Sequence, residues 1–381
     1  MLVLKSFLQT TMNGGDMKNI IKIASAFMGI IIGAGFASGQ EILQYFTSFG
    51  IKGTIGAVIS VVLFGYLGMV LTKLGSRLQT DSHKDVIYKI SGRYLGVIID
   101  SILVFILFGI GIVMISGSGS IFNQQFGLPN FVGITLMTVL VLITILSNVD
   151  RVVNVIAMIT PFLIIGVIVL FIYSMMTWDH SLMQMNSIAN DQPSATKHWL
   201  PSVINYVSLA IAMGASMTLV MGGDESNEQI ASYGGLVGGL GVGILIVMHH
   251  LAIFASIDVV GDLDMPSLGL ANQLSPIFGV LYSIILFGMI FNSAVSMFFS
   301  FGTRFFAPKT KKYNWFVTIS ILIAFGASFF GFKQLVSFFY PLFGYLGMVL
   351  IVVLILASIR MKPLKREQRN KAYHFKNITN E

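Results

Sequence analysis

A carboxylate directly follows a glycine-rich apolar stretch near the N-terminus. Residues 29–41 read GIIIGAGFASGQE and end on Glu41. An ionisable side chain inside an apolar segment is costly, so a functional role is the first hypothesis for it. Glu41 could bind a cation, neutralise a substrate amine or exchange a proton. The structural alternative is an interfacial carboxylate that Lys52 neutralises.

The glycines of this stretch have two interpretations. Glycine weakens a helix interior by about 1 kcal/mol relative to alanine, so the cluster favours an unwound segment. Freed backbone groups are tolerated in a bilayer only where they line a cavity or are buried in protein. The spacings Gly29/Gly33 and Gly35/Gly39 are also GxxxG pairs, which bring helices close together. A second such stretch, LAIAMGASMTLVMGGDES, places Gly214 near its centre and predicts another interruption.

Further polar residues lie within apolar segments. Asn292, Ser293 and Ser296 offer oxygen ligands, or hydrogen bonds between helices, and Ser296 shares a helical face with either Asn292 or Ser293. Asp100 could join a proton path or a cytoplasmic gate, with an ion pair to a loop residue as the alternative. The adjacent His249 and His250 point to different helix faces and cannot form an i, i+4 metal pair, so no metal site is predicted.

The composition assigns these segments to a membrane. The chain has 381 residues, 55% of them hydrophobic and only 10% charged, whereas soluble proteins have about 25% charged residues. The net charge of +7 is not arranged as a basic stripe among aromatic residues, so no nucleic-acid partner is predicted. The absence of cysteine excludes thiol catalysis and disulfides.

Ten apolar segments are long enough to be candidate crossings. They lie near residues 18–48, 53–75, 95–121, 129–148, 152–177, 200–222, 232–256, 276–303, 313–330 and 333–359. With both termini inside, 20 of the 23 Lys and Arg residues fall on the inner side, as the positive-inside rule requires. An acidic patch of Asp224, Glu225 and Glu228 on this basic side is predicted to pair with Lys or Arg and latch a gate.

The predicted organisation is one transmembrane domain with two tails. An N-terminal tail covers 1–17, the transmembrane domain covers 18–360, and a basic cytoplasmic tail that contacts anionic lipid covers 361–381. Two five-helix halves, 18–177 and 200–359, run in opposite directions. Glycine-interrupted segments at the start of both halves are typical of the binding site of a secondary transporter. No phosphate-binding loop is present, so ATP-driven pumping is not expected.

These features resemble the LeuT-type fold of the amino acid–polyamine–organocation superfamily. The motif GAGFASGQEI at 33–42 is similar to that of the YkvI-type bacterial membrane proteins, a group regarded as amino-acid permeases. The resemblance covers about residues 18–360. It implies an all-α protein with ten transmembrane helices in a 5+5 inverted repeat, helices 1 and 6 interrupted, in the bacterial cell (inner) membrane.

The resemblance also implies site residues. The substrate-binding set is Gly33, Ala34, Gly35, Phe36, Ser38, Glu41, Met213, Gly214 and Ser216. The ion-coupling set is Ile31, Ala34, Asn292, Ser293, Ser296 and Asp100. The family pattern has two adjacent hydroxyl residues where this chain has Asn292 and Ser293, so Na⁺ and H⁺ both stay open as coupling ions.

The sequence therefore predicts a secondary active transporter that moves a small organic solute, an amino acid or a related compound, by ion-coupled alternating access. It predicts no enzyme activity, because no catalytic motif is present, and no cofactor. The alternative is a non-transporting membrane sensor or accessory subunit on a transporter scaffold. The oligomeric state is left open.

Overall fold

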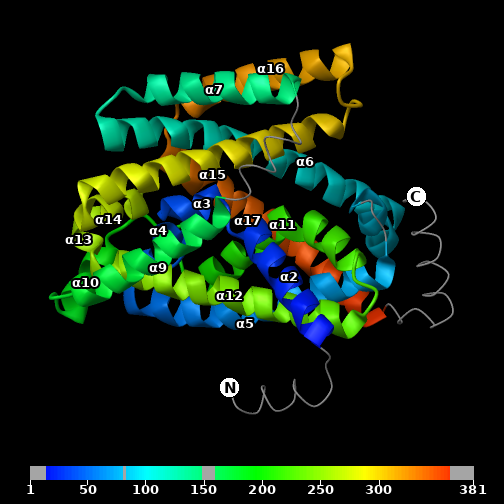
Figure 1. The fold of residues 1–381 in the computed structure, drawn as a ribbon, viewed down its shortest axis with the longest axis horizontal. Helices are drawn as coiled ribbons and strands as arrows, with labels where there is room; N and C mark the ends of the chain where they lie inside the picture. Colours follow the sequence, from blue (N-terminus) through cyan, green and yellow to red (C-terminus); the bar gives the residue numbers. More distant parts are fainter. Residues whose placement is uncertain (1–13, 80–82, 148–158, 361–381) are drawn as a thin grey trace.

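The computed structural model describes residues 14–79, 83–147 and 159–360, and every regular element in these ranges is a helix (Figure 1). The predicted tail at 361–381, with its lipid contact, and the first part of the segment at 152–177 lie outside these ranges. In chain order the helices are α2 (Gly14–Ile31), α3 (Ala34–Ser38), α4 (Gln40–Tyr45), the 3-10 helix η1 (Thr47–Phe49), α5 (Gly50–Leu78), α6 (His83–Phe126), α7 (Asn130–Leu146), α9 (Thr160–Met176), α10 (Leu182–Asn190), α11 (Trp199–Gly223), α12 (Glu228–Ala255), α13 (Ile257–Val260), α14 (Pro266–Leu274), α15 (Pro276–Thr303), α16 (Lys311–Ser328) and α17 (Phe332–Arg360).

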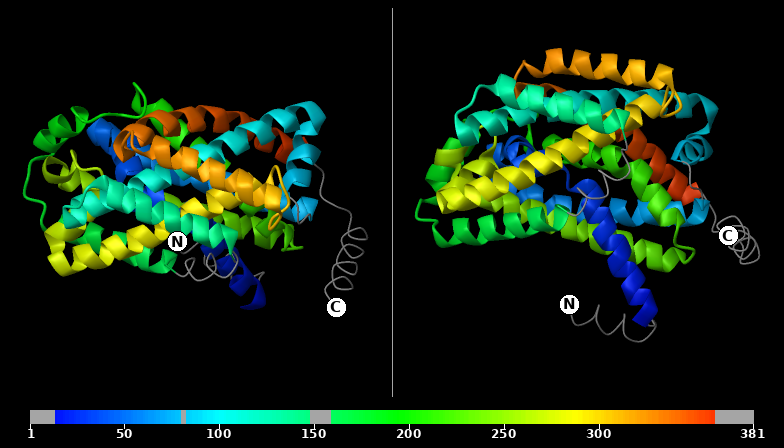
Figure 2. Two further views of the ribbon diagram at one scale, coloured as in Figure 1. Left: turned by 90° about the horizontal axis from the view of Figure 1, so that it is seen from above. Right: turned by 45° about the horizontal axis from the view of Figure 1, so that its top comes forward.

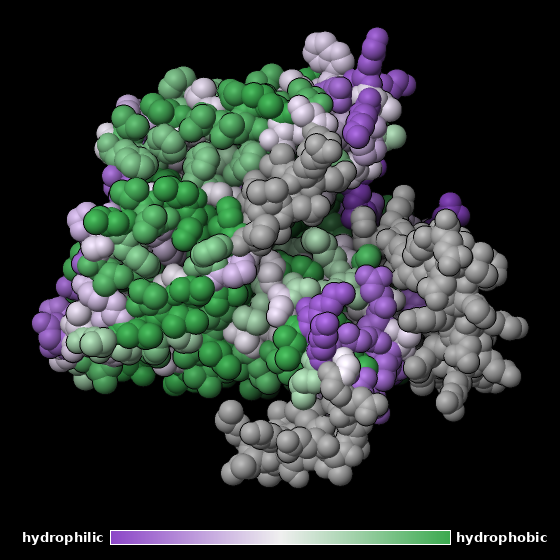
Figure 3. All heavy atoms as spheres, viewed as in Figure 1, coloured by the Kyte–Doolittle hydropathy of each residue, from purple (hydrophilic) through white to green (hydrophobic). Residues whose placement is uncertain are grey.

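Helices of membrane-spanning length dominate the fold. Among the described residues, six stretches are long and apolar enough to cross a bilayer: Gln40–Leu78, Ser91–Phe126, Trp199–Gly223, Glu228–Ala255, Pro276–Thr303 and Phe332–Arg360. Two shorter apolar helices, α7 and α9, accompany them. Apolar residues cover the middle of the face in Figure 3, and hydrophilic residues gather at its left edge and right side. The chain is a multi-pass membrane protein, as predicted.

The first apolar segment is broken, as the glycine cluster predicts. The i→i−4 backbone ladder of α2 ends with Ile32 N–H donating to the Met28 carbonyl at 2.8 Å. It resumes in α3, where Ala37 N–H donates to the Gly33 carbonyl at 3.1 Å. A second break follows at Gly39, whose φ of 81° is a left-handed conformation that favours glycine. The chain therefore changes direction twice, just before and just after α3.

The predicted interruption of the sixth segment is wrong. Helix α11 runs unbroken from Trp199 to Gly223. Gly214 serves close packing instead, because a Cβ there would lie 2.6 Å from Ile31 Cδ1 and 3.0 Å from Ile30 Cγ2. The absent side chain makes room for the end of α2 and does not mark an unwound turn.

Glycines on two faces of α12 allow two neighbouring helices, α5 and α2, to pack closely against it. Gly235, Gly239 and Gly243 recur every four residues and approach the backbone of α5. Gly234 and Gly238 face α2, where a Cβ would lie 2.6 Å from Ile23 Cβ and 2.8 Å from the Ala24 carbonyl oxygen, respectively. Helix α2 leans across α12, and its first turns extend beyond the edge of the bundle (Figure 2). Backbone contact of this kind fixes α5 and α12 as one unit.

We expect Gly239→Ala to destabilise this unit, because the added Cβ would overlap the Phe64 carbonyl oxygen. Overpacking of this kind costs about 1–3 kcal/mol. The thermal unfolding midpoint of the purified protein in detergent measures the effect. The control is Gly326→Ala on α16, where no atom lies within 4 Å of the added Cβ. Equal unfolding midpoints for the two variants would contradict the packing argument.

Candidate functional site

The Glu41 side chain folds back over the break in the first segment. It is 7% exposed and lies in the first turn of α4. A Cβ at Gly35 would overlap its Oε1 atom, so the carboxyl group occupies the space that a side chain at position 35 would take. The absence of a side chain at Gly35 is therefore required for the observed position of the Glu41 carboxyl group.

Two tyrosines from other helices flank this carboxyl group. Tyr206 of α11 donates a hydrogen bond from its hydroxyl to Glu41 Oε2 at 3.3 Å. Tyr340 of α17 lies beside the same carboxyl, with its hydroxyl 3.0 Å from the point where a Gly35 side chain would begin. Tyr206 is held by aromatic contacts, with ring centroids 5.2 Å from both Tyr45 and Phe46. The acid is thus fixed in position by three different helices.

A buried amide ties these three helices together. Asn205 of α11 accepts a hydrogen bond from the Tyr45 hydroxyl at 3.0 Å and donates one to the Pro341 carbonyl at 2.9 Å. It is fully buried, and Gly344 makes room for it, since a Cβ there would overlap Asn205 Oδ1. The amide keeps α4, α11 and α17 in register around Glu41.

Helix α14 closes the other side of α3. Its Ser267 lies against Gly39 and bonds His249 Nε2 of α12 at 2.6 Å. The His249 ring packs edge-on against Phe36, with centroids 4.8 Å apart. The Tyr282 hydroxyl of α15 donates to the Ala37 carbonyl at 2.7 Å. Phe36 therefore belongs to the wall between the break and α14.

A small cavity lies at the break. It is lined by Ile31, Gly33, Ala34, Gly35, Glu41, Ile110, Met114, Tyr206, Leu209, Ala210, Met213 and Ser293. Seven of these were named from the sequence. Ile110 and Met114 of α6, and Tyr206, Leu209 and Ala210 of α11, were not.

The other predicted substrate-binding residues lie outside this lining. Ser38 stabilises the second break, where its hydroxyl donates to the Gly35 carbonyl at 2.8 Å and accepts from Gln40 N–H at 3.1 Å. Gly214 packs against Ile30 and Ile31. Ser216 is half-buried further along α11.

Some of the predicted ion-coupling residues line the cavity, and others lie outside its lining. Ile31, Ala34 and Ser293 meet at the cavity. Asn292 lies next to Ser293 on α15, and its buried Oδ1 atom has no hydrogen-bond partner among the described residues. Asp100 forms an ion pair with Arg304, which is the alternative that the sequence left open for it.

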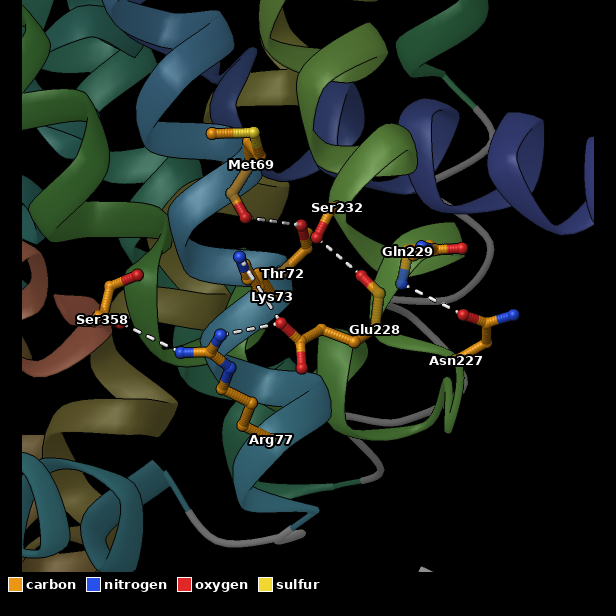
Figure 4. Close-up of polar contacts among 9 residues, drawn as sticks. All are labelled: Met69, Thr72, Lys73, Arg77, Asn227, Glu228, Gln229, Ser232 and Ser358. Carbon is orange, nitrogen blue, oxygen red and sulfur yellow. Dashed lines mark hydrogen bonds and ion pairs between the residues drawn. The ribbon is translucent and has the colours of Figure 1, made fainter. Parts of the chain in front are cut away.

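A charged network joins α5, α12 and α17 at one end of the bundle (Figure 4). Arg77 Nη2 lies 2.8 Å and Lys73 Nζ 3.4 Å from Glu228 Oε1. Arg77 Nη1 also donates to the Ser358 carbonyl at 2.9 Å. Asn19 of α2 donates to Glu225 Oε2 at 3.2 Å. The predicted pairing of the acidic patch with basic residues is confirmed for Glu228.

We expect Arg77→Gln to destabilise the protein. The change removes a half-buried ion pair and a bond to α17, at a cost of about 1–2 kcal/mol. A fall of several degrees in the unfolding midpoint measures it. Arg93→Gln, at an exposed position on α6, is the matched loss of charge and should leave the midpoint unchanged. If both variants melt together, the network has no structural role.

No known protein-family profile matches the chain. The chain is 28% identical to the uncharacterized membrane protein YkvI of Bacillus subtilis (strain 168) over 339 residues, 88% of this chain and 94% of YkvI. It is 24% identical to the uncharacterized protein YyaD of the same organism over 335 residues, 88% of this chain and 96% of YyaD. Both are homologues of this chain. The resemblance to YkvI that the motif at 33–42 predicts is confirmed.

Solved structures share the fold across most of the chain. Mhp1 in an inward-facing conformation superposes with a TM-score of 0.64 at 12% identity, covering 89% of this chain and 75% of Mhp1. A manganese transporter of Eremococcus coleocola gives 0.60 at 14% identity, covering 96% of this chain and 85% of that one. MhsT in complex with L-phenylalanine gives 0.57 at 16% identity, covering 90% and 92%. The chain has the LeuT-type fold that these structures share.

Proposed function

We propose that this YkvI homologue is a secondary active transporter that binds its solute at the break between α2 and α3. The observation that carries the proposal is the cavity at this break, which brings a buried carboxylate of α4 together with residues of five further helices. Interrupted helices around a central polar site are typical of secondary transporters. The fold of the solved neighbours supports the same conclusion.

The proposed topology has ten crossings in two inverted halves, with both termini inside. The distribution of Lys and Arg supports this orientation. In the proposed topology the Arg77–Glu228 network lies at the inner end and α14 at the outer end. Alternating access then requires the inner network and the outer contacts of Ser267 to open at different times.

The proposed substrate is a small organic solute with an amino group, an amino acid or a related compound. Glu41 supplies the charge for the amine, and the apolar wall accommodates the body of the solute. MhsT, whose structure holds L-phenylalanine, supports an organic substrate. A metal ion is less well supported, because the described residues contain no group of three or more His, Cys, Asp or Glu side chains that could hold one.

Coupling to Na⁺ or H⁺ is proposed because no nucleotide-binding motif is present. A sodium site would use the backbone oxygens of Ile31–Ala34 with Asn292, Ser293 and Ser296. The unpartnered Asn292 Oδ1 supports an oxygen ligand at this position. A proton would use Glu41.

Uptake into proteoliposomes tests the proposal. We expect at least one labelled solute from a panel of amino acids and their decarboxylated amines to accumulate when a Na⁺ or H⁺ gradient is imposed. Protein-free liposomes are the control. Saturable binding to the purified protein without any flux would favour a sensor or accessory subunit instead. Absence of both binding and flux would contradict the proposal.

A further inference from the structure

The cavity at the break contains one acid and no base. Glu41 is the only Asp or Glu in its lining, and the lining contains no Lys, Arg or His. Apart from Tyr206 and Ser293, the other side chains of the lining are apolar. A solute in this cavity therefore meets one negative charge and no side chain that could neutralise a carboxylate.

The surroundings of Glu41 do not supply a positive charge either. The titratable groups that face it are Tyr206 of α11, Tyr340 of α17 and Tyr45 of α4 itself. From α12, the nearest such group to α3 is His249, which is engaged with Ser267 and Phe36. The ion pairs found among the described residues involve Asp100, Asp179, Glu228 and Asp258, and none of these pairs includes Glu41.

A bare carboxylate at this depth is expensive. Moving an ion out of water without a partner carries a large penalty, which protonation or pairing removes. A conformational change that closes the cavity around Glu41 and opens it to the other side of the membrane is therefore favoured only when the charge of Glu41 is neutralised. A proton and an ammonium group both do this at the same two oxygen atoms, so one excludes the other.

Building on the proposed transport function, we propose that Glu41 holds either a proton or the ammonium group of an organic amine, and that the protein exchanges one for the other across the membrane. When the amine binds, the proton leaves the Glu41 carboxyl for water on that side. When the amine is released on the opposite side, the carboxylate takes up a proton from water there. One positive charge moves in each direction, so the cycle is electroneutral.

The absence of a cationic side chain from the cavity lining also favours amines over amino acids as substrates. The lining contains no cationic side chain that could pair with the carboxylate of an amino acid. An amine with a short apolar body leaves no charge unpaired. The cavity would therefore discriminate against amino acids, because their carboxylate would be buried without a cationic partner.

Binding to the purified protein tests the competition without any flux. The probes are two pairs that differ only in the carboxylate, namely isoamylamine with leucine and phenethylamine with phenylalanine. We expect each amine to bind at least tenfold more tightly than its amino acid. We also expect the apparent Kd of the amine to rise by up to tenfold for each unit of acidification, with release of up to one proton per bound amine. Calorimetry in buffers of different ionisation enthalpy counts the proton. Tighter binding of the amino acids, or a Kd indifferent to pH between 4 and 9, would overturn the inference.

Flux separates this inference from the proposed function. We expect labelled isoamylamine to enter proteoliposomes preloaded with unlabelled amine faster than empty ones, without electrical current, after subtraction of the leak into Glu41→Gln proteoliposomes. Uptake driven by a Na⁺ gradient, or by protons moving in the same direction as the solute, would overturn exchange while leaving the transporter proposal intact. If no solute moves at all and the protein stays folded, both proposals fail.

Discussion

Glu41→Gln should abolish solute uptake while leaving the protein at least as stable as the wild type. The amide keeps the shape of the side chain and can still accept the hydrogen bond from Tyr206. It cannot neutralise a bound amine. Loss of one partner from a buried ion pair costs about 3–5 kcal/mol, which corresponds to more than about 100-fold in affinity or rate.

The opposite signs of the two effects make this result diagnostic. A buried carboxylate without a cationic partner destabilises a fold, so its replacement by a neutral isostere should raise or preserve the unfolding midpoint. Sites that sacrifice stability for function behave in this way. A substitution that merely damaged the fold would lower the midpoint and the uptake together.

Asp191→Asn is the matched control, because it removes an exposed acid at the end of α10 that is not part of the cavity lining. Its uptake and unfolding midpoint should equal those of the wild type. Uptake by Glu41→Gln within about threefold of the wild type would contradict a role for the charge in solute binding. The initial rate of uptake of each transported member of the panel is the quantity to compare.

The break beside Glu41 was predictable from the sequence because glycine density and an acid in an apolar segment are local signals. Gly33 and Gly39 flank α3 at the two breaks, and the left-handed conformation of Gly39 is a local preference of glycine that needs no partner. The same reasoning failed at Gly214, where the glycine accommodates Ile31 across an unbroken helix. The sequence alone does not distinguish a glycine at a helix break from a glycine at a close helix–helix contact, because the contact depends on a partner helix elsewhere in the chain.

Residues whose role comes from a distant partner could not be found this way. Tyr206 lies in an apolar helix 165 residues from Glu41, and no local pattern marks its hydroxyl as the one that meets the acid. The pairing of Asp100 with Arg304 crosses 204 residues for the same reason. On α12, by contrast, the four-residue recurrence of Gly235, Gly239 and Gly243 is a visible signal for close helix packing, although it does not reveal which helix fills each face.

Gly35→Ala should impair transport because it displaces the acid itself. The new Cβ would overlap Glu41 Oε1, so the carboxyl group must rotate away from the break or α3 must shift. Alanine is a better helix former than glycine, so the change should not weaken α3 itself. Its unfavourable effect is the displacement of the Glu41 carboxyl group. We expect binding of the transported solute to weaken by about tenfold to 100-fold, since a misplaced charge loses much of a geometry-dependent ion pair.

Gly29→Ala separates this effect from a general sensitivity of the glycine-rich segment. It lies six residues earlier, on α2, and no atom lies within 4 Å of the added Cβ, so uptake should match the wild type. If the two alanine variants bind the solute equally well, the site does not depend on the position of the carboxyl group over Gly35. If Gly29→Ala alone impairs uptake, its GxxxG spacing with Gly33 is used for helix contact in another state of the cycle. Binding and uptake must therefore be measured on the same preparations, because Gly35→Ala should impair both, whereas a change confined to helix contact should impair uptake alone.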